Sequence, residues 1–307
     1  MILAICFFHD ENFKKGDIHI DIKDLELFRT VVNHKNVTKA AHELSYVQSN
    51  VTNRLNKIEK EVGLILLTRT NKGVLLTAEG ERFLEFVDKM IQLHREMIDT
   101  MKSPDTPSGQ LNVGATDITT AARLPEVLTT FLESYPMVEF SLINGSSKEL
   151  IQDVLKFNID GAFITDVIDQ PKITQEKLIE EELVLISNKD HHSIHTLSNL
   201  KKDTILVFKS GCTYRRKLEE WVAREGVIVR KVEFGTIEGM IGCVKAGLGV
   251  ALVSKLIAEQ LNTDDKIQFH EVPEEYRYVT TVFIRRKDIP MTNAMHKFLE
   301  VTRHTFS

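Results

Sequence analysis

Cysteine and long hydrophobic runs are scarce in this sequence, and their scarcity excludes several classes of protein. The three cysteines, Cys6, Cys212 and Cys243, are too few and too scattered for a disulfide framework or a zinc ribbon. No run of about 18 apolar residues occurs, so we expect no membrane-spanning helix. A reducing cytoplasm is therefore the expected location.

Positive charge is also in short supply. Among 307 residues, 39 Lys and Arg stand against 44 Asp and Glu, which gives a net charge of −5. This overall balance gives no indication of a nucleic-acid partner, so such a partner must be argued from local charge. The hydrophobic content of 42% argues against disorder, and the length predicts two or three domains.

Residues 1–20 are an extension whose apolar start lacks the basic region and cleavage site of a secretory signal. The run Lys14-Lys15-Gly16-Asp17 can be encoded as AAA AAA GGA GAT, which contains a purine-rich ribosome-binding sequence. Two interpretations stay open. The extension is either a disordered tail or a non-native leader translated ahead of a true start near Ile20, and the nucleotide sequence of the gene would decide.

Residues 21–77 have the pattern of three helices followed by a hairpin. Apolar residues recur at helical spacing over 25–32, and Thr38 is expected to cap the next helix. A third helix is predicted over about 47–62, and two apolar runs around 71–73 predict the hairpin. This order predicts a winged helix-turn-helix domain.

Residues 78–101 predict a long linker helix, which a hinge over 102–110 follows. An isolated helix cannot bury an apolar stripe of the coiled-coil type, so this helix needs a partner. Either a second chain or the neighbouring domain would serve, and dimerisation is favoured. The stripe consists of Phe83, Phe86, Met90, Leu93 and Met97.

Residues 111–307 alternate between strand and helix patterns, which predicts a parallel α/β sheet in two lobes. The predicted strands are 111–115, 138–143, 161–165, 183–187, 204–208, 227–234, 249–253 and 278–284. The predicted helices are 122–135, 148–157, 214–224, 237–246 and 291–304.

The polar face of the 47–62 helix has the side chains of a recognition helix. In a helix-turn-helix the second helix enters the major groove, where Gln, Asn, Ser and Thr bond base edges. From Lys35 to Lys72 seven basic side chains face three acidic ones, a net charge of +4 where phosphates would lie. A solvated polar face is the alternative, but it would not also explain the hairpin and the charge. The face carries Gln48, Ser49, Thr52, Asn53, Asn56 and Lys57.

A gapless signature runs through this region: Ala40-Ala41-His42-Glu43-Leu44, Gln48, Val51, Thr52, Leu55, Ile58-Glu59, Gly63, Leu66, Arg69 and Leu76-Thr77-Ala78-Glu79-Gly80. It resembles the signature of the LysR-type transcriptional regulators, and the resemblance extends from Asp21 to the C-terminus. The sequence is most similar to the branch named cobalt–zinc–cadmium-type (CzcR-like) regulators, a name that does not establish a metal ligand. Two departures, Val47-Gln48-Ser49 for Ser-Gln-Pro and Leu-Thr-Ala-Glu-Gly for Leu-Thr-x-Ala-Gly, bear on DNA sequence preference more than on fold.

The resemblance implies double-stranded DNA as a partner, read at a palindromic site by a homodimer or homotetramer. Arg54 is expected at a base edge or a phosphate, and Arg69 and Lys72 at the DNA backbone. Thr38 and Lys57 are further candidate DNA contacts. The family's base-contact positions fall on Gln48, Ser49, Thr52 and Asn53.

The resemblance also implies an effector domain over 111–307, similar to a type 2 periplasmic binding protein. Lobe one would hold 111–180 and 285–307, and lobe two 181–284, joined by two crossing strands. In such folds a small ligand lies between the lobes, near helix N-termini that suit anions.

The candidate effector-binding residues carry many hydroxyl groups, which predicts a small polar or anionic effector. Arg215 would be its anion partner, although caps and turns are an alternative role for each hydroxyl. The candidates are Thr116, Thr119, Thr120, Thr165, Ser210, Gly211, Cys212, Tyr214, Arg215 and Thr236.

Two alternatives remain open. Cys212 at a helix start would suit a thiol sensor, and His191, His192 and His195 would suit a metal-responsive regulator. An enzyme is not expected, because no Gly-x-Ser-x-Gly elbow, P-loop or His-Glu-x-x-His motif is present and Asp117 lacks an evident partner. An architectural DNA binder is not expected either, because such a protein would need no cleft between two lobes. We expect no cofactor, no resident metal and no membrane partner.

Overall fold

The computed structural model describes residues 20–70, 73–102, 106–191, 194, 197 and 204–306. The chain divides into two compact units, one that ends at Arg95 and one that begins at Glu96. The predictions for residues 1–19, Lys72, His192 and His195 fall outside the described residues.

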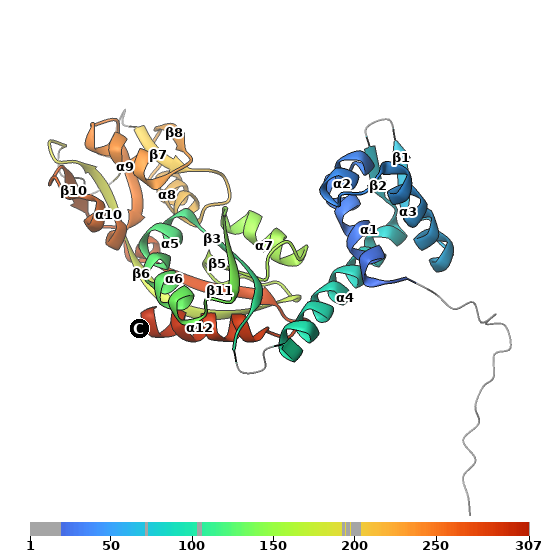
Figure 1. The fold of residues 1–307 in the computed structure, drawn as a ribbon. Coiled ribbons are helices and arrows are strands. Elements are labelled where there is room, and N and C mark those ends of the chain that lie inside the picture. Colours follow the sequence, from blue (N-terminus) through green and yellow to red (C-terminus); the bar gives the residue numbers. More distant parts are fainter. Residues whose placement is uncertain are drawn as a thin grey trace, which may run out of the picture. The chain divides into compact units, whose positions relative to one another are not determined.

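The first unit is a winged helix-turn-helix (Figure 1). Strands β1 and β2 pair in antiparallel fashion, with Leu67 opposite Leu76, and form the wing. This order of elements agrees with the predicted one. The elements are α1 (Ile22–His34), α2 (Val37–Glu43), α3 (Gln48–Val62), β1 (Leu67–Thr70), β2 (Gly73–Leu76) and α4 (Ala78–Lys102), the last of which continues into the second unit.

The cap of α2 differs from the prediction. Asn36, and not Thr38, is the N-cap residue, because its backbone is extended and its side chain accepts a hydrogen bond from the Lys39 amide. Thr38 lies in the first turn, where its hydroxyl donates to Oε1 of Gln48 over 3.2 Å. The predicted cap at Thr38 is therefore wrong, and Thr38 instead connects α2 to the start of α3.

Two residues of the signature have clear structural roles in the wing. Glu59 on α3 accepts hydrogen bonds from the amides of Leu66 and Leu67 over 2.8 and 3.0 Å, which fixes the approach to β1. Gly80 lies in the first turn of α4, where a Cβ atom would come within 2.0 Å of the Leu66 carbonyl oxygen. Only glycine permits this close approach of helix and wing.

The second unit contains a mixed sheet of nine strands in its described part, with the order β4-β3-β5-β11-β6-β9-β7-β8 and β10 paired to β6. The strands are β3 (Gly109–Ala115), β4 (Val138–Asn144), β5 (Gly161–Thr165), β6 (Ile173–Asn188), β7 (Thr204–Phe208), β8 (Arg230–Phe234), β9 (Val250–Ser254), β10 (Ile267–His270) and β11 (Tyr278–Arg286). The helices are α5 (Asp117–Ala122), α6 (Leu124–Ser134), α7 (Ser147–Leu155), α8 (Thr213–Arg224), α9 (Ile237–Lys245), α10 (Lys255–Leu261), α11 (Glu274–Arg277) and α12 (Asn293–Phe306).

Two long antiparallel strands, β6 and β11, run through both halves of this sheet and create two lobes (Figure 1). Strands β3, β4 and β5 are parallel to one another in lobe one, and β7, β8 and β9 are parallel in lobe two. The parallel prediction therefore holds within each lobe. It is wrong for β6, β10 and β11, because the chain must cross between lobes and return, which places these strands antiparallel to their neighbours.

Local chemistry explains other differences from the predicted elements. The predicted helix over 122–135 corresponds to α6, which begins at Leu124 with Pro125 in its first turn, where a missing amide hydrogen is tolerated. Elements α5, α10, β10 and α11 lie where none was predicted. Within the described residues, no helix has the length and apolar content that a membrane span requires.

Each lobe has its own hydrophobic core. In lobe one Phe131, Phe163 and Phe298 form an aromatic cluster, with ring centroids 5.2 Å apart for Phe131 and Phe298 and 5.9 Å for Phe163 and Phe298. In lobe two Trp221 stacks on Tyr276 at 6.0 Å. Each core supports one of the two lobe surfaces that line the cavity described below.

Candidate functional site

The recognition helix α3 presents the predicted polar face. Val51, Leu55 and Ile58 are buried in the core of the first unit. On the other side Gln48, Ser49 and Asn53 are exposed, and Thr52 is half-buried. Val47, the N-cap residue, provides no side-chain hydrogen bond, so the first-turn amides of α3 lack the oxygen that a serine would supply.

Two cationic candidates flank this face. Arg69 on the wing is exposed and donates from Nη2 to Oδ1 of Asn56 on α3 over 3.1 Å. Lys57 is exposed and lies 3.5 Å from a carboxylate oxygen of Asp24. Both side chains border the same helix surface, as a role at the DNA backbone requires.

Arg54 lies differently from the other DNA-contact candidates. Its Nε donates to Oδ1 of Asp24 over 2.6 Å, and Nη2 lies 3.3 Å from Oδ1 of Asp21. The ring of Tyr46 lies 5.7 Å from the guanidinium carbon. These contacts hold Arg54 against the N-terminal end of α1, which assigns it a structural role in this conformation.

The apolar stripe on α4 consists of one residue that packs inside the first unit and four that are exposed. Phe83 packs inside the first unit, with its ring centroid 5.1 Å from that of Phe28. Phe86, Met90, Leu93 and Met97 are each at least half exposed, at 65, 53, 58 and 50%. A stripe of this kind predicts a partner surface.

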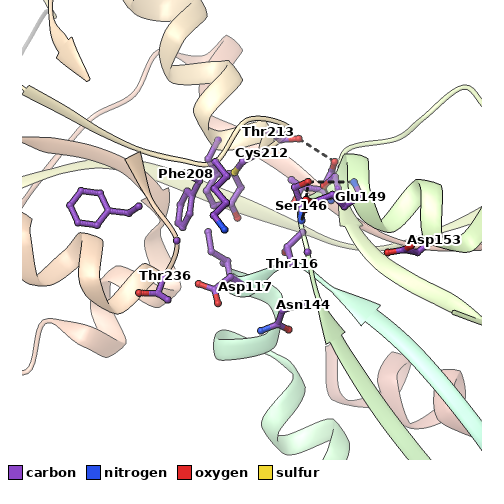
Figure 2. A pocket seen from close by; sticks show the side chains of 18 residues that line it. Thr116, Asp117, Asn144, Ser146, Glu149, Asp153, Phe208, Cys212, Thr213 and Thr236 are labelled. Atoms are coloured by element: carbon purple, nitrogen blue, oxygen red, sulfur yellow. Dashed lines mark hydrogen bonds between the residues drawn. The ribbon is translucent and has the colours of Figure 1, made fainter. Parts of the chain in front are cut away.

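A cavity of about 570 Å³ lies between the two lobes of the second unit (Figure 2). Lobe one contributes the ends of β3, β4 and β5 with the starts of α5 and α7, and lobe two the ends of β7 and β8 with the starts of α8 and α9. Five predicted residues line it: Thr116, Thr165, Cys212, Tyr214 and Thr236. Other lining residues, which the sequence analysis missed as effector contacts, are Asp117, Ile118, Asn144, Gly145, Ser146, Ser147, Glu149, Asp153, Phe208, Lys209, Thr213, Phe234 and Gly235.

Two predicted hydroxyls support this lining from behind. Thr119 is buried and its Oγ1 lies 2.9 Å from Oγ1 of Thr116, while Thr120 donates to Oδ1 of Asn144 over 2.8 Å. They position residues that face the cavity.

Ser210, Gly211 and Arg215 line a separate hollow of about 220 Å³. Arg215 donates to Glu233 over 2.6 Å and to Glu219 over 3.1 Å. The guanidinium group of Arg215 is thus engaged by these two carboxylates. The prediction that Arg215 is an anion partner in the main cavity does not match this placement.

Three contacts join the lobes across the cavity. The Ile237 amide, at the start of α9, donates to Oδ2 of Asp117 over 3.0 Å. Thr213 donates from Oγ1 to the Thr165 carbonyl over 3.3 Å. Arg216 on α8 pairs with Asp166 after β5 over 2.8 Å.

A buried carboxylate, that of Glu181 on the crossing strand β6, connects the two lobes. It accepts hydrogen bonds from Arg123 over 3.1 Å, and from Tyr214 and Thr281 over 3.4 Å each. Burial, together with the charge of Glu181, raises the pKa of Tyr214 well above its ordinary value, so Tyr214 keeps the proton that it donates. Because Arg123 belongs to lobe one and Glu181 and Tyr214 to lobe two, a change in the angle between the lobes must rearrange the bond from Arg123.

The thiol and metal alternatives gain no support from the described residues. Burial raises the pKa of the Cys212 thiol, which disfavours the reactive thiolate. Cys243 packs against the core of lobe two. Within the part of the chain that the structure describes, no three potential metal ligands come together, and only His191 of the predicted histidines falls in that part.

Three of the missed lining residues carry one recoverable signal. Asp117, Asn144 and Lys209 each lie at or just beyond the end of a strand, as the predicted Thr116 does. A rule that takes every polar residue at these positions would have found them. The sequence around Asp117 does not indicate its hydrogen-bond partner, because Ile237 lies 120 residues away.

Two family models match this chain. "Bacterial regulatory helix-turn-helix protein, lysR family" matches residues 22–81, and "LysR substrate binding domain" matches residues 104–307. The chain belongs to the LysR family of transcriptional regulators. Members of this family are regulators and not enzymes, which agrees with the missing catalytic motifs.

Curated relatives and solved structures extend the match over nearly the whole chain. The regulator SoxR of Arthrobacter sp. (strain TE1826) is 42% identical over 93% of this chain and 97% of its own. A regulator named CzcR from Bacillus thuringiensis (strain Al Hakam) is 39% identical over 93 and 95%. The crystal structure of ArgP from Mycobacterium tuberculosis superposes with a TM-score of 0.73 at 16% identity, covering 94% of this chain and 98% of that one. The predicted resemblance to LysR regulators is thereby confirmed, and CzcR-named proteins are among the relatives.

Proposed function

We propose that this LysR-family regulator acts in the cytoplasm, where it reads a partly palindromic promoter site through α3 and the wing. The observation that carries the proposal is the polar face of α3, with Gln48, Ser49 and Asn53 exposed opposite three buried apolar residues. Gln and Asn bond adenine edges in bidentate fashion, and Ser reaches several bases. Thr52 completes this base-reading set.

The phosphate contacts are proposed to come from the border of this face. Arg69 on the wing and Lys57 on α3 lie at the edge of this face, Lys72 lies in the wing sequence, and Thr38 adds a hydroxyl near Gln48. Arg54 is proposed to act through the Asp24 contact, by positioning α3, and not through a base. Neutralised phosphates release counterions, so affinity must fall as salt rises.

We further propose a homodimer, or a homotetramer built from dimers, that contacts two half-sites. The exposed stripe of Phe86, Met90, Leu93 and Met97 supports a paired helix, since four large apolar side chains in one row gain by burial against a second copy. A dimer would place two copies of α3 on successive turns of the DNA.

The effector is proposed to bind in the cavity of about 570 Å³ between the lobes. The contacts across the cavity and the bonds of Glu181 give the domain a coupled arrangement that a ligand can bias. A ligand changes the DNA-bound state only if its affinity differs between the arrangements of the lobes.

A gel-shift and footprint titration tests the regulator proposal. The full chain is titrated at stated salt on DNA from upstream of its own gene, with random DNA of equal length as control. We expect a protected, partly palindromic site that is bound far more tightly than random DNA. Binding to neither DNA at any salt concentration would overturn the proposal.

A further inference from the structure

The helix N-termini that face the cavity are largely satisfied by the protein itself. Such N-termini are the usual anion sites in two-lobed domains. At α5 the Thr116 side chain accepts from the Thr119 amide, and at α7 Ser146 and Glu149 form a reciprocal capping box. At α9 Thr236 accepts from the Gly239 amide, and Asp117 from the opposite lobe accepts from the Ile237 amide. An anionic effector would have to displace these oxygens at α5, α7 or α9, whereas at α8 the N-cap residue Cys212 makes no side-chain hydrogen bond.

The charge of the lining also opposes an anion. Asp117, Glu149 and Asp153 line the cavity, and Lys209 is the one cation beside them among its described lining residues. The next cations along the chain, Arg215 and Arg216, do not line it, and both are paired with carboxylates. A further negative charge in this cavity would meet a negative field.

Asp117 differs from the other two carboxylates because its hydrogen bond comes from the opposite lobe. Glu149 is held by the Ser146 amide and hydroxyl, each over 2.8 Å, and Asp153 accepts from Asn158 over 2.9 Å. The hydrogen bond that the described structure gives Asp117 goes to Oδ2, which leaves Oδ1 for a donor in the cavity. Its side chain is half-buried at the cavity wall beside Thr116 (Figure 2).

We propose that the effector carries a protonated amine and that Asp117 binds it. The inference rests on the proposed function, because it names the ligand class of the cavity assigned there. The amine donates to Oδ1 while Oδ2 keeps the Ile237 amide, so the same carboxylate connects the ligand to α9 of the other lobe. Lys209 then meets any carboxylate at the other end of the ligand. Of the small polar or anionic effector predicted from the sequence, this proposal keeps the small polar ligand and makes it a cation or a zwitterion in place of a simple anion.

Four small probes, each with three carbon atoms, test whether the cavity prefers a cation or an anion. They are propylamine, β-alanine, propionate and 1-propanol, added to the full chain at neutral pH and constant ionic strength. The readout is the unfolding temperature followed by the fluorescence of Trp221, the chain's one tryptophan, which lies in lobe two. We expect saturable stabilisation by the two amine-bearing probes and none by propionate or 1-propanol. Stronger stabilisation by β-alanine than by propylamine identifies a zwitterion site, and the reverse a simple amine site.

Three variants separate a contact from a general charge effect. Asp117→Asn keeps an oxygen for the Ile237 amide but loses the ion pair, so amine affinity should fall about tenfold or more. Asp117→Glu should restore part of that affinity. Glu139→Gln removes an exposed negative charge outside the cavity lining and should leave probe binding unchanged.

The outcomes separate the two proposals. Preference for propionate, stabilisation by neither amine, or equal amine binding by Asp117→Asn overturns the amine inference. The gel shift of the wild-type chain without any probe tests the regulator proposal alone. A chain that binds its promoter but not the amines therefore contradicts only the inference about the effector.

Discussion

Arg54 on α3 donates a hydrogen bond from Nε to Oδ1 of Asp24 on α1 over 2.6 Å, and the Asp24 side chain is only 2% exposed. Lys57 lies 3.5 Å from the other oxygen of the same carboxylate. A carboxylate this buried is tolerated because it is paired and hydrogen-bonded. The pair connects the recognition helix to the helix that packs behind it, so the angle of α3 depends on it.

The first prediction concerns this pair. Arg54→Met should lower the free energy of unfolding of the first unit by about 3 kcal/mol, because it leaves the buried Asp24 charge with weaker compensation. Hydrogen exchange of the amides of α1 and α3 measures this unit separately from the lobes. Adding Asp24→Asn to Arg54→Met should recover most of the loss. Unchanged exchange combined with a loss of specific DNA binding would instead assign Arg54 to the bases.

The second prediction concerns base reading. Thr52→Ala and Asn53→Ala should each weaken binding to the promoter site by about 1–3 kcal/mol and leave binding to random DNA nearly unchanged. Lys72→Ala is the matched contrast, since a phosphate contact weakens both DNAs alike. Titrations at one salt concentration measure all three variants. Equal losses of Asn53→Ala on both DNAs would remove Asn53 from the base-contact set.

The third prediction concerns the exposed stripe of α4. Leu93→Glu should dissociate the oligomer and weaken promoter binding, because a charge replaces an apolar side chain that is worth about 1.5–3 kcal/mol when buried. Sedimentation velocity measures the change. Leu93→Met keeps the surface apolar and should remain oligomeric. An unchanged oligomer in Leu93→Glu would place the interface elsewhere.

The sequence predicts most of the helix-turn-helix unit because its elements follow local rules. The period of Val51, Leu55 and Ile58 identifies the buried face of α3, and Gly63 ends the helix with φ of 73°. The cap of α2 is harder, since Asn36 and Thr38 are both good capping residues two positions apart. The extended backbone at Asn36 decides between them, and the sequence does not contain it.

The effector cavity is less predictable because its contacts come from distant parts of the chain. Thr116 and Thr236 could be found by their positions at helix starts. The partner of Asp117 lies 120 residues away, so no spacing rule indicates this pair. Arg215 has the right charge for an anion site, but Glu219 and Glu233 engage it.

The fourth prediction concerns the pH dependence of Asp117. Burial raises the pKa of this carboxyl above its ordinary value of 3.8, and repulsion from Glu238 adds to the rise, against the hydrogen bond from Ile237. The folded state therefore holds the proton more tightly than the unfolded state, so this contribution to stability is present at low pH and is lost as pH rises through the raised pKa. Asp117→Asn has no carboxyl group at this position, so the variant should not lose this contribution to stability as pH rises. Urea unfolding followed by Trp221 fluorescence should show the variant gaining on the wild type from low to neutral pH, and a constant difference would contradict the assignment.

The last prediction uses Glu149, which lines the same cavity and has the opposite shift. Hydrogen bonds from the Ser146 amide and hydroxyl lower the pKa of this carboxyl below its ordinary value of 4.5. Its contribution to stability is therefore present above that ordinary value and is lost as pH falls through the lowered pKa. Glu149→Gln should be less stable than the wild type at neutral pH, and the difference should shrink in acid. Because both variants remove one negative charge from one cavity, a shared dependence on net charge would give the two curves the same sign. Opposite signs in the same Trp221 assay would show that the hydrogen bonds of each carboxylate and its burial, rather than the total charge of the cavity, set its effect on stability.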